Sequence, residues 1–545
     1  MPIVLLREGT SETKGNQAQR NNITAAKTIA EIVRSSLGPR GMDKMLVNNI
    51  GDVTITNDGA TILKEIDVQH PAAKMMVEIS KATDNEVGDG TTSTVVLAGS
   101  LLSKAEELIA KDVHPTVIVD GYTMASEKAI EVLRNAATKV DPTDRQILGK
   151  IARTSMASKL VSVNSEPLSK IVIDAVIAIA QKPVDNNNLR VDTDSIKVEK
   201  KAGGSIEDTK LIEGIVLDKE VVHGAMPKRI EDAKIALLNA ALEIEKTEMS
   251  AEIRISDPQQ MQMFLEEENR MLKSMVDKIT ASGANVLLCQ KGIDDLAQHY
   301  LAKNGILTVR RVKESDMNNL AKATEGRVLS NIDELSASDL GYAKLVEERK
   351  VETDKWVFVE GCKNPKAVSI LVRGGSQRIV DEAERSVHDA IMAVKDVVEY
   401  PYVTVGAGAP EVYISQKIRE WTSSLSGRSH LAAERFADGV EEIAIALAEN
   451  AGMDPLDTQA QLRAKAAGAK PKYGVDVING KVSDMAAKDI YEPLKVKEQV
   501  INAATEASCM ILRIDDVIAA SKSKESGPPP GAGMGGMGGM GGMDM

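Results

Sequence analysis

Segments with helical periodicity lie at both ends of the chain, whereas the middle mixes strand-like and helix-like segments. Toward the two ends, apolar residues recur every three or four positions over residues 20–37, 91–109, 377–398 and 429–450. In the middle, a strand, a helix and a second strand are predicted over residues 284–289, 293–303 and 306–312. A domain built from both chain ends, with other domains inserted within it, would explain this order.

The composition limits what the chain binds and how its cores are built. At roughly 100–200 residues per domain, its 545 residues predict three or four domains. Phe, Trp and Tyr make up only 2% of the residues, so the cores must consist mainly of Ala, Val, Ile, Leu and Met. Because the net charge is −13 and few rings are available to stack on bases, we expect no nucleic-acid partner.

Cysteine, histidine and hydropathy patterns bear on location and metal chemistry. The cysteines, Cys289, Cys362 and Cys509, are far apart, which is typical of a reducing cytoplasm and argues against disulfides or a cysteine zinc site. The six histidines show no paired ligand spacing. Charges interrupt every apolar stretch, and Arg7 comes too early for a signal peptide, so we expect a cytoplasmic protein without membrane spans.

The segment Gly88-Asp89-Gly90-Thr91-Thr92-Ser93 opens a predicted helix and suits an anion. It matches neither a P-loop nor a Rossmann fingerprint, because Ser93 stands where the third glycine of the latter would be. Even so, free backbone N–H groups and hydroxyls at a helix start can hold a phosphate. Asp89 beside that phosphate would need a cation, and a shared Mg²⁺ is the natural solution. The alternative is that Asp89 or Thr91 only caps the helix.

Three further positions are candidates for a site, of which the first two are weak by themselves and the third, Asp389, is more informative. Residues 35–41 form a second turn where backbone could approach a ligand, and Asp58 follows a predicted strand over residues 53–56. Asp389 lies about 200° around its helix from Val387, away from the apolar stripe. It is therefore free to face solvent or another domain.

Two segments could make contacts outside a folded core. The apolar residues Met261, Met263, Phe264 and Leu265 run into three glutamates, which indicates either an ordinary surface helix or an exposed element that contacts varied partners. From Ser526 the chain is nearly all Gly, Pro and Met, which predicts a flexible tail whose methionines are either adhesive or inert.

Four motifs follow one another along the chain. They are Ser36-Leu37-Gly38-Pro39-Arg40-Gly41-Met42-Asp43-Lys44, Thr56-Asn57-Asp58-Gly59-Ala60-Thr61-Ile62-Leu63, Gly88-Asp89-Gly90-Thr91-Thr92 and Val387-His388-Asp389-Ala390. Together they resemble the group II chaperonins, most closely the archaeal thermosome and next the related eukaryotic cytosolic chaperonin. The likeness covers essentially the whole chain, including the Gly-Gly-Met tail, and four ordered motifs make it highly specific.

The resemblance implies a multidomain fold of α and α/β domains in which two domains are split in sequence. A mainly helical equatorial ATPase domain would comprise residues 1–146 and 404–525, and a small intermediate hinge domain residues 147–216 and 370–403. An α/β apical domain that binds substrate would comprise residues 217–369, with a helical lid protrusion at about 245–280. Residues 526–545 would form the flexible tail.

The resemblance also implies roles for individual residues. The nucleotide would be bound by Leu37, Gly38, Pro39, Gly90, Thr91, Thr92, Ser93, Lys159, Gly408 and Glu492. Lys159 would sense the γ-phosphate, while Gly408 and Glu492 would bracket the base and ribose. Asp89 would bind Mg²⁺, and Asp58 and Asp389 would position and activate the attacking water. The lid contacts would be Met261, Met263, Phe264 and Leu265.

The chain departs from the family pattern at two of these places. Ala407 stands where the family usually has a third glycine, which puts close backbone approach there in doubt. Ser158 stands where glycine is common, which puts the flexibility of the loop before Lys159 in doubt.

The implied function is that of an ATP-hydrolysing chaperone. Identical or paralogous subunits would form stacked double rings that enclose non-native polypeptides under an ATP-driven lid, with Mg²⁺ as cofactor and K⁺ as a further candidate. One alternative is a ring-shaped holdase or scaffold that captures polypeptides without needing ATP. Another is a small-molecule ATP-dependent enzyme, for which the sequence offers no separate substrate site.

Overall fold

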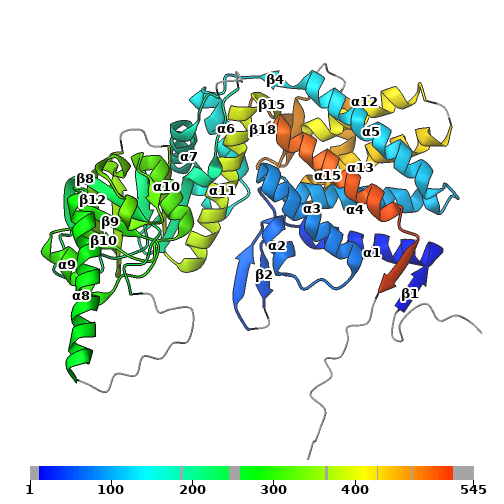
Figure 1. Cartoon of the computed structure of the whole chain (residues 1–545). Helices are drawn as coiled ribbons and strands as arrows, with labels where there is room; N and C mark the ends of the chain where they lie inside the picture. Colours follow the sequence, from blue (N-terminus) through cyan, green and yellow to red (C-terminus); the bar gives the residue numbers. More distant parts are fainter. Residues whose placement is uncertain are drawn as a thin grey trace, which may run out of the picture.

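The protein is described by a computed structural model that covers residues 11–519 except 49, 184–187, 245–257, 363–365, 426, 467 and 469. The helices and strands form three parts that follow one another along the long dimension of the molecule (Figure 1). Each part contains a large hydrophobic core. The predicted tail over 526–545 and residues 245–257 of the predicted protrusion lie outside the described residues.

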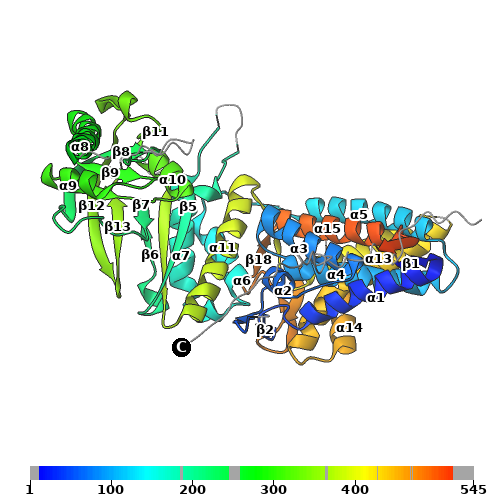
Figure 2. The same ribbon diagram turned by 60° about the horizontal axis from the view of Figure 1, so that its bottom comes forward.

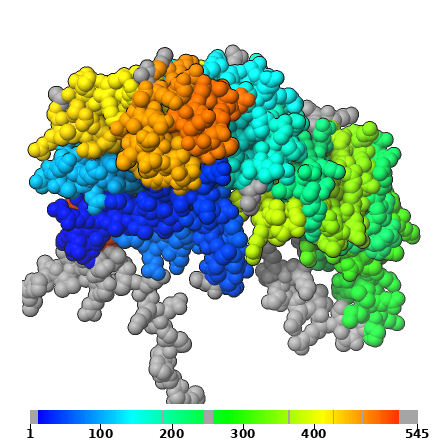
Figure 3. All heavy atoms as spheres, turned by 180° about the vertical axis from the view of Figure 1, so that it is seen from behind, coloured from blue at the N-terminus to red at the C-terminus, as the bar shows by residue number. Residues whose placement is uncertain are grey.

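The first core is helical and is built from both ends of the chain. Its helices are α1 (Gly15–Arg34), α2 (Gly59–Glu65), α3 (Pro71–Val87), α4 (Thr91–Ile109), α5 (Pro115–Ala136), α12 (Ala409–Thr422), α13 (Arg428–Asn450), α14 (Pro455–Lys465) and α15 (Leu494–Leu512). Seen from behind, the N-terminal helices lie directly against the C-terminal ones (Figure 3). The two chain ends therefore share one packed interior.

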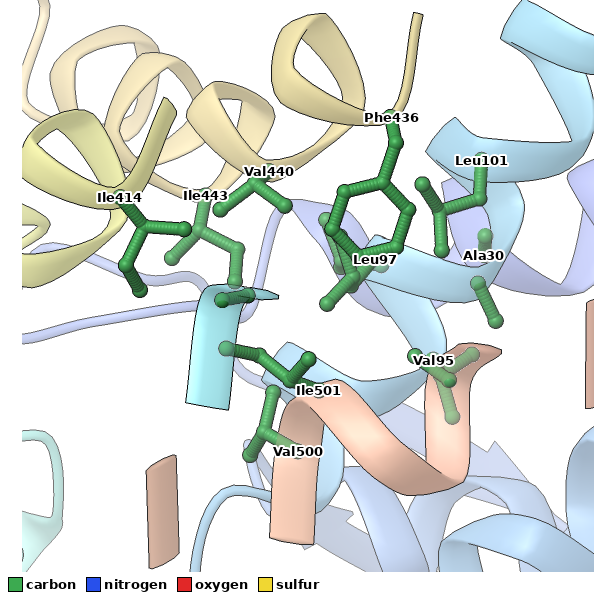
Figure 4. Packing of buried hydrophobic residues seen from close by; sticks show 14 of the residues in the cluster. Ala30, Val95, Leu97, Leu101, Ile414, Phe436, Val440, Ile443, Val500 and Ile501 are labelled. Atoms are coloured by element: carbon green, nitrogen blue, oxygen red, sulfur yellow. The ribbon is translucent and has the colours of Figure 1, made fainter. Parts of the chain in front are cut away.

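Small and aliphatic residues hold this core together, as the low aromatic content predicts. A Cβ on Gly99 of α4 would lie 2.2 Å from the Cβ of Ala30 of α1, so these helices approach as closely as glycine permits. Figure 4 shows aliphatic side chains from α4, α12, α13 and α15 in one cluster with Phe436. Its ring meets that of Tyr122 edge-on, with 5.6 Å between the centroids.

Short strands connect or flank these helices in antiparallel pairs. They are β1 (Ser11–Lys14) with β19 (Asp516–Ala519), β2 (Lys44–Val47) with β3 (Val53–Thr56), β16 (Tyr473–Asp476) with β17 (Lys481–Asp484), and β15 (Tyr402–Val405) between β4 (Thr138–Lys139) and β18 (Tyr491–Pro493). The pairing of β1 with β19 joins the two ends of the chain in space.

The second core lies in the middle of the sequence and is α/β. Its strands are β7 (Gly214–Leu217), β8 (Arg229–Leu238), β9 (Val286–Cys289), β10 (Leu307–Val309), β11 (Val328–Leu329), β12 (Gly341–Val351) and β13 (Asp354–Glu360), and its helices are α8 (Pro258–Ala281), α9 (Asp295–Lys303) and α10 (Glu314–Thr324). The sheet order is β10-β9-β8-β12-β13-β7, with β11 beside β8. Strands β9 and β10 are parallel and joined by α9, which confirms the predicted β-α-β unit.

The third core lies between the other two and is made from two separated segments (Figure 2). Its helices are α6 (Arg145–Met156), α7 (Ser165–Ile179) and α11 (Gln377–Glu399), and its strands are β5 (Ile196–Ala202), β14 (Val368–Gly374) and β6 (Lys210–Ile212), in the order β5-β14-β6. Among the helices of the described residues, none is both long and apolar enough to cross a membrane.

Candidate functional site

A cavity of about 910 Å³ opens where the first core meets the third. This volume falls within the roughly 300–1,000 Å³ of small-molecule sites. Eight of the predicted ligand-binding or metal-binding residues line it: Leu37, Gly38, Pro39, Asp89, Gly90, Ser93, Gly408 and Glu492. The structure therefore brings segments from both ends of the chain to one cavity.

Two left-handed glycines shape the turn from α3 into α4. Gly88 has a φ of 66° and Gly90 a φ of 77°, a conformation that favours glycine. A Cβ on Gly90 would also lie 2.8 Å from Val500, so the turn can pass α15 only without a side chain. Gly90 is the residue that precedes α4, and no side chain caps that helix, so the capping alternative for Asp89 and Thr91 is wrong. The first backbone N–H groups of α4 keep their capacity to bind an anion.

Asp58 lies next to the start of α4. It precedes α2, and its Oδ2 accepts a hydrogen bond from the N–H of Thr61 across 2.8 Å. Gly59 leaves room for the neighbouring helix, because a Cβ there would lie 2.5 Å from the hydroxyl of Thr92. Thr91 and Thr92 belong to the first turn of α4 but do not line the cavity, and Thr91 is buried.

Lys159 connects Asp58 to Asp389. Its Nζ lies 3.1 Å from Oδ2 of Asp389 on α11 and 3.7 Å from Oδ1 of Asp58. Asp389 is only 7% exposed, so the solvated position that the sequence left open for it is wrong. The apolar stripe of α11 faces its own core, and the Asp389 side faces Lys159 and the first core.

Burial and mutual attraction shift the pKa values of all three groups. Burial raises the pKa of Asp389 well above its usual value, and the charge of Lys159 only partly opposes this. Burial would lower the pKa of Lys159, but Asp389 and Asp58 reverse the effect and raise it. For Asp58, burial is outweighed by Lys159 and by the hydrogen bonds from Thr61, so its pKa falls. The site thus pairs an ionised carboxylate with a more basic one.

Glu492 also lines the cavity. Its Oε1 accepts a hydrogen bond from the N–H of Ala407 across 3.3 Å. Ala407 has a φ of 60°, so alanine holds here a left-handed conformation that glycine would take more easily. Gly408 follows with a φ of 77° and precedes α12. The loop thus adopts this left-handed conformation despite the alanine.

Sequence reasoning missed a group that joins α11 to the Asp58 turn. Glu382 is 1% exposed, and its Oε2 accepts hydrogen bonds from Thr56 across 3.3 Å and from Arg385 across 2.6 Å. The hydroxyl oxygen of Thr56 in turn accepts the N–H of Asp58 across 3.1 Å. Glu382 lies seven residues before Asp389, which places both on one helix face, and that spacing was the available signal.

Lys497 and Glu411 were also missed. Lys497 lines the cavity from the first turn of α15, and its Nζ lies 2.7 Å from Glu411 and 2.5 Å from Glu492. No motif contains Lys497 or Glu411, so only the fold reveals their proximity.

The predicted contact residues lie far from the cavity, on the first half of α8, which extends away from the second core (Figure 1). Met261, Met263, Phe264 and Leu265 are 51%, 68%, 47% and 53% exposed. In contrast, the buried residues of α8, such as Leu272 and Val276, lie in its second half. The exposed cluster therefore has no partner within the described part of this chain.

The model of the TCP-1/cpn60 chaperonin family matches residues 29–522. The chain belongs to this family. The thermosome subunit alpha of Archaeoglobus fulgidus is 57% identical over 528 residues, which cover 97% of this chain and 96% of the relative. Thermosome subunits of Methanopyrus kandleri and Pyrococcus horikoshii are 56% and 55% identical and cover 95% and 96% of this chain, and 95% and 94% of their own lengths.

These relatives confirm the resemblance to the group II chaperonins and the thermosome that the four motifs predicted. They also confirm the fold class, a multidomain chaperonin fold of helical and α/β parts. As a chaperonin, the chain is a chaperone for protein folding.

Proposed function

We propose that this chaperonin subunit binds and hydrolyses ATP and uses the hydrolysis to close a lid over a non-native polypeptide. The observation that supports this most is the Asp389–Lys159–Asp58 cluster beside the cavity, because it combines groups from the first and third cores. An ATPase whose catalytic groups lie on two domains couples its chemistry to domain closure.

The residues that line the cavity would contact different parts of a nucleotide. The phosphates would lie against Gly90, Thr91, Thr92 and Ser93 at the start of α4, with Leu37, Gly38 and Pro39 along the nucleotide. Gly408 and Glu492 would hold the base and ribose at the other side. Lys159 would sense the γ-phosphate.

Asp89 would hold Mg²⁺ together with phosphate oxygens. Mg²⁺ is commonly bound by one or two carboxylates plus phosphates, and Asp89 supplies such an oxygen ligand on the cavity wall. Across the described ranges no three His, Cys, Asp or Glu side chains converge on one metal position, so a shared site of this kind fits better than a protein cage. Bound Mg²⁺ would neutralise phosphate charge, and K⁺ is a further candidate cation.

Asp58 and Asp389 would position and activate the attacking water. Asp389 suits proton abstraction because burial raises its pKa and so makes its carboxylate more basic. Asp58 stays ionised and would orient the water, and Lys159 fixes the distance between the two carboxylates. In phosphoryl transfer, such positioning and charge stabilisation account for most of the catalysis.

The three cores would correspond to the three chaperonin domains. We assign the equatorial domain to residues 1–146 and 404–525, the intermediate domain to 147–216 and 370–403, and the apical domain to 217–369. The lid protrusion would be α8 with the residues before it. Its exposed cluster, Met261 to Leu265, would contact clients or neighbouring lids.

The assembly would be a stacked double ring of identical or paralogous subunits. Two relatives from Archaeoglobus fulgidus are named thermosome subunit alpha and thermosome subunit beta, which supports an assembly with paralogous members. Clients would be non-native polypeptides in the cytoplasm, and neither nucleic acid nor a membrane would be a partner.

Refolding of a denatured test protein tests this proposal against an ATP-independent holdase. We expect folded product with ATP but not with a non-hydrolysable analogue. Protection from aggregation without ATP-dependent release would favour the holdase instead. Asp89→Ala should weaken the Mg²⁺ dependence of nucleotide binding, and an unchanged dependence would refute its role as metal ligand.

A further inference from the structure

Three charged side chains form a cluster at the wall of the cavity, in which Lys497 and Glu411 are buried and Glu492 is partly exposed. Lys497 is 7% exposed and Glu411 is 3% exposed, and the Nζ of Lys497 lies 2.7 Å from Oε1 of Glu411. The same ammonium lies 2.5 Å from Oε2 of Glu492. The three residues come from α15, the first turn of α12 and β18, so the cluster exists only because these elements pack together.

The backbone is built to accept Glu492 at this position. A Cβ on Gly406 would lie 2.3 Å from Oε1 of Glu492, so only glycine leaves room for the carboxylate. The next residue, Ala407, holds a left-handed φ of 60° and donates its N–H to that oxygen. Backbone on one side and Lys497 on the other therefore fix both oxygens of Glu492.

Within the cluster, Lys497 is the charge that favours an ionised Glu492. Burial raises the pKa of Glu492, the charge of Glu411 adds to that rise, and the charge of Lys497 opposes it. Lys497 itself stays charged, because Glu411 and Glu492 outweigh the effect of burial and raise its pKa. Removing Lys497 would leave two carboxylates without their shared cation, a costly arrangement in a buried site.

Among the hydrogen-bond donors of a nucleotide, only the ribose offers two neighbouring hydroxyls to a fixed carboxylate. Phosphates repel it unless a cation lies between them, whereas the two ribose hydroxyls can donate to it. We propose that Lys497, held by Glu411, is a positioning residue that sets the Glu492 carboxylate to receive the ribose hydroxyls. This inference rests on the proposed nucleotide function and adds to it a determinant of sugar recognition.

The affinities for ADP and 2′,3′-dideoxy-ADP test this role without any contribution from hydrolysis. The wild-type protein should bind ADP about tenfold more tightly than 2′,3′-dideoxy-ADP, because a hydrogen bond to a charged group strengthens binding by about this factor. In Lys497→Met and in Glu492→Ala, this ratio of dissociation constants should fall to about one. Lys497→Arg keeps the charge and should largely retain the ratio.

Other variants separate positioning from a general loss of structure. Glu411→Gln should lower the ratio part of the way, and it serves as a second test where Lys497→Met fails to fold. Lys495→Met removes a paired lysine two residues away that does not line the cavity, and it should leave the ratio unchanged.

The outcomes distinguish this inference from the proposed function. A wild-type protein that binds neither nucleotide contradicts both. A wild-type ratio that persists in Lys497→Met and Glu411→Gln overturns the positioning role alone. Equal weakening of ADP and 2′,3′-dideoxy-ADP in Lys497→Met, with the ratio intact, also overturns it, because Lys497 would then act on the phosphates or on folding.

Discussion

The Nζ of Lys159 lies 3.1 Å from Oδ2 of Asp389, within a cluster that also includes Asp58 of the first core. Both Lys159 and Asp389 belong to segments of the third core, which therefore places this cation and this carboxylate near Asp58 as one unit. A shift of the third core against the first would change the distance of both groups from Asp58. This relationship underlies the predictions on turnover.

Replacing Lys159 should affect both catalysis and stability. Lys159→Met leaves Asp58 and Asp389 without their common cation, and breaking such a buried pair costs about 3–5 kcal/mol. We expect a lower free energy of unfolding and a large loss of ATP turnover. Lys159→Arg, which keeps the charge, should retain more of both. Wild-type stability and turnover in Lys159→Met would contradict the linking role.

We expect the hydroxyl of Thr56 to contribute to stability and turnover through its hydrogen bonds and not only through its size. Thr56→Val keeps the shape but removes the donor to Glu382 and the acceptor for the N–H of Asp58. An unsatisfied buried polar group costs about 1–3 kcal/mol, so we expect that loss in unfolding free energy together with slower turnover. Thr56→Ser, the matched control, should resemble the wild type. Equal behaviour of the two variants would show that the hydroxyl is not needed.

Asp396 should make stability depend on pH. It is fully buried on α11, 3.2 Å from Lys495, and burial raises its pKa from 3.8 to about 7. Between these two pKa values the folded state keeps a proton on Asp396 that the unfolded state has released. The contribution of Asp396 to the free energy of unfolding is therefore fully present below about pH 4 and is lost as pH rises through 7. The loss amounts to about 4 kcal/mol at roughly 1.4 kcal/mol per pKa unit.

Thermal unfolding at pH 5 and pH 8 checks the role of Asp396. Asp396→Asn should reduce the fall in melting temperature between these two pH values. Asp381→Asn changes a half-buried carboxylate on the same helix and should leave the fall unchanged. If Asp396→Asn shows the same pH dependence as the wild type, the buried carboxylate is not its source.

The exposed cluster on α8 should act on polypeptides and not on ATP. The double variant Met263→Gln/Phe264→Gln should prevent aggregation of a denatured protein less well, because it removes apolar surface from the protrusion. Its ATPase rate without client should stay within about twofold of the wild type. Met510→Gln changes a methionine that is 59% exposed on α15 and serves as the control. Undiminished protection by the double variant would refute the contact role.

Local signals in the sequence predicted the elements near the site well. The glycines of Gly88-Asp89-Gly90 predicted the start of α4, which begins at Thr91. The helix predicted over 377–398 is one residue longer in the structure and ends at Glu399. The helix predicted over 20–37 ends earlier, at Arg34, because residues 35–39 already form the turn at the cavity.

Long-range burial could not be predicted in the same way. Periodicity shows that Asp389 leaves the apolar stripe of α11, but it cannot show that Lys159, 230 positions away in sequence, covers that side. The contact of Lys497 with Glu411 likewise depends on the packing of α15 against its neighbours. In both cases the prediction requires the tertiary structure. Each charge is tolerated in the interior only with its partner, and that partner is distant in sequence.

Single-turnover ATP hydrolysis by Asp389→Ala tests the central claim most directly. The variant should bind ATP with near wild-type affinity but hydrolyse it at least about 100-fold more slowly, the usual loss when a general base is removed. Asp381→Ala, which changes a carboxylate of the same helix that pairs with Lys200, should hydrolyse ATP normally. A wild-type rate of hydrolysis in Asp389→Ala would contradict the account.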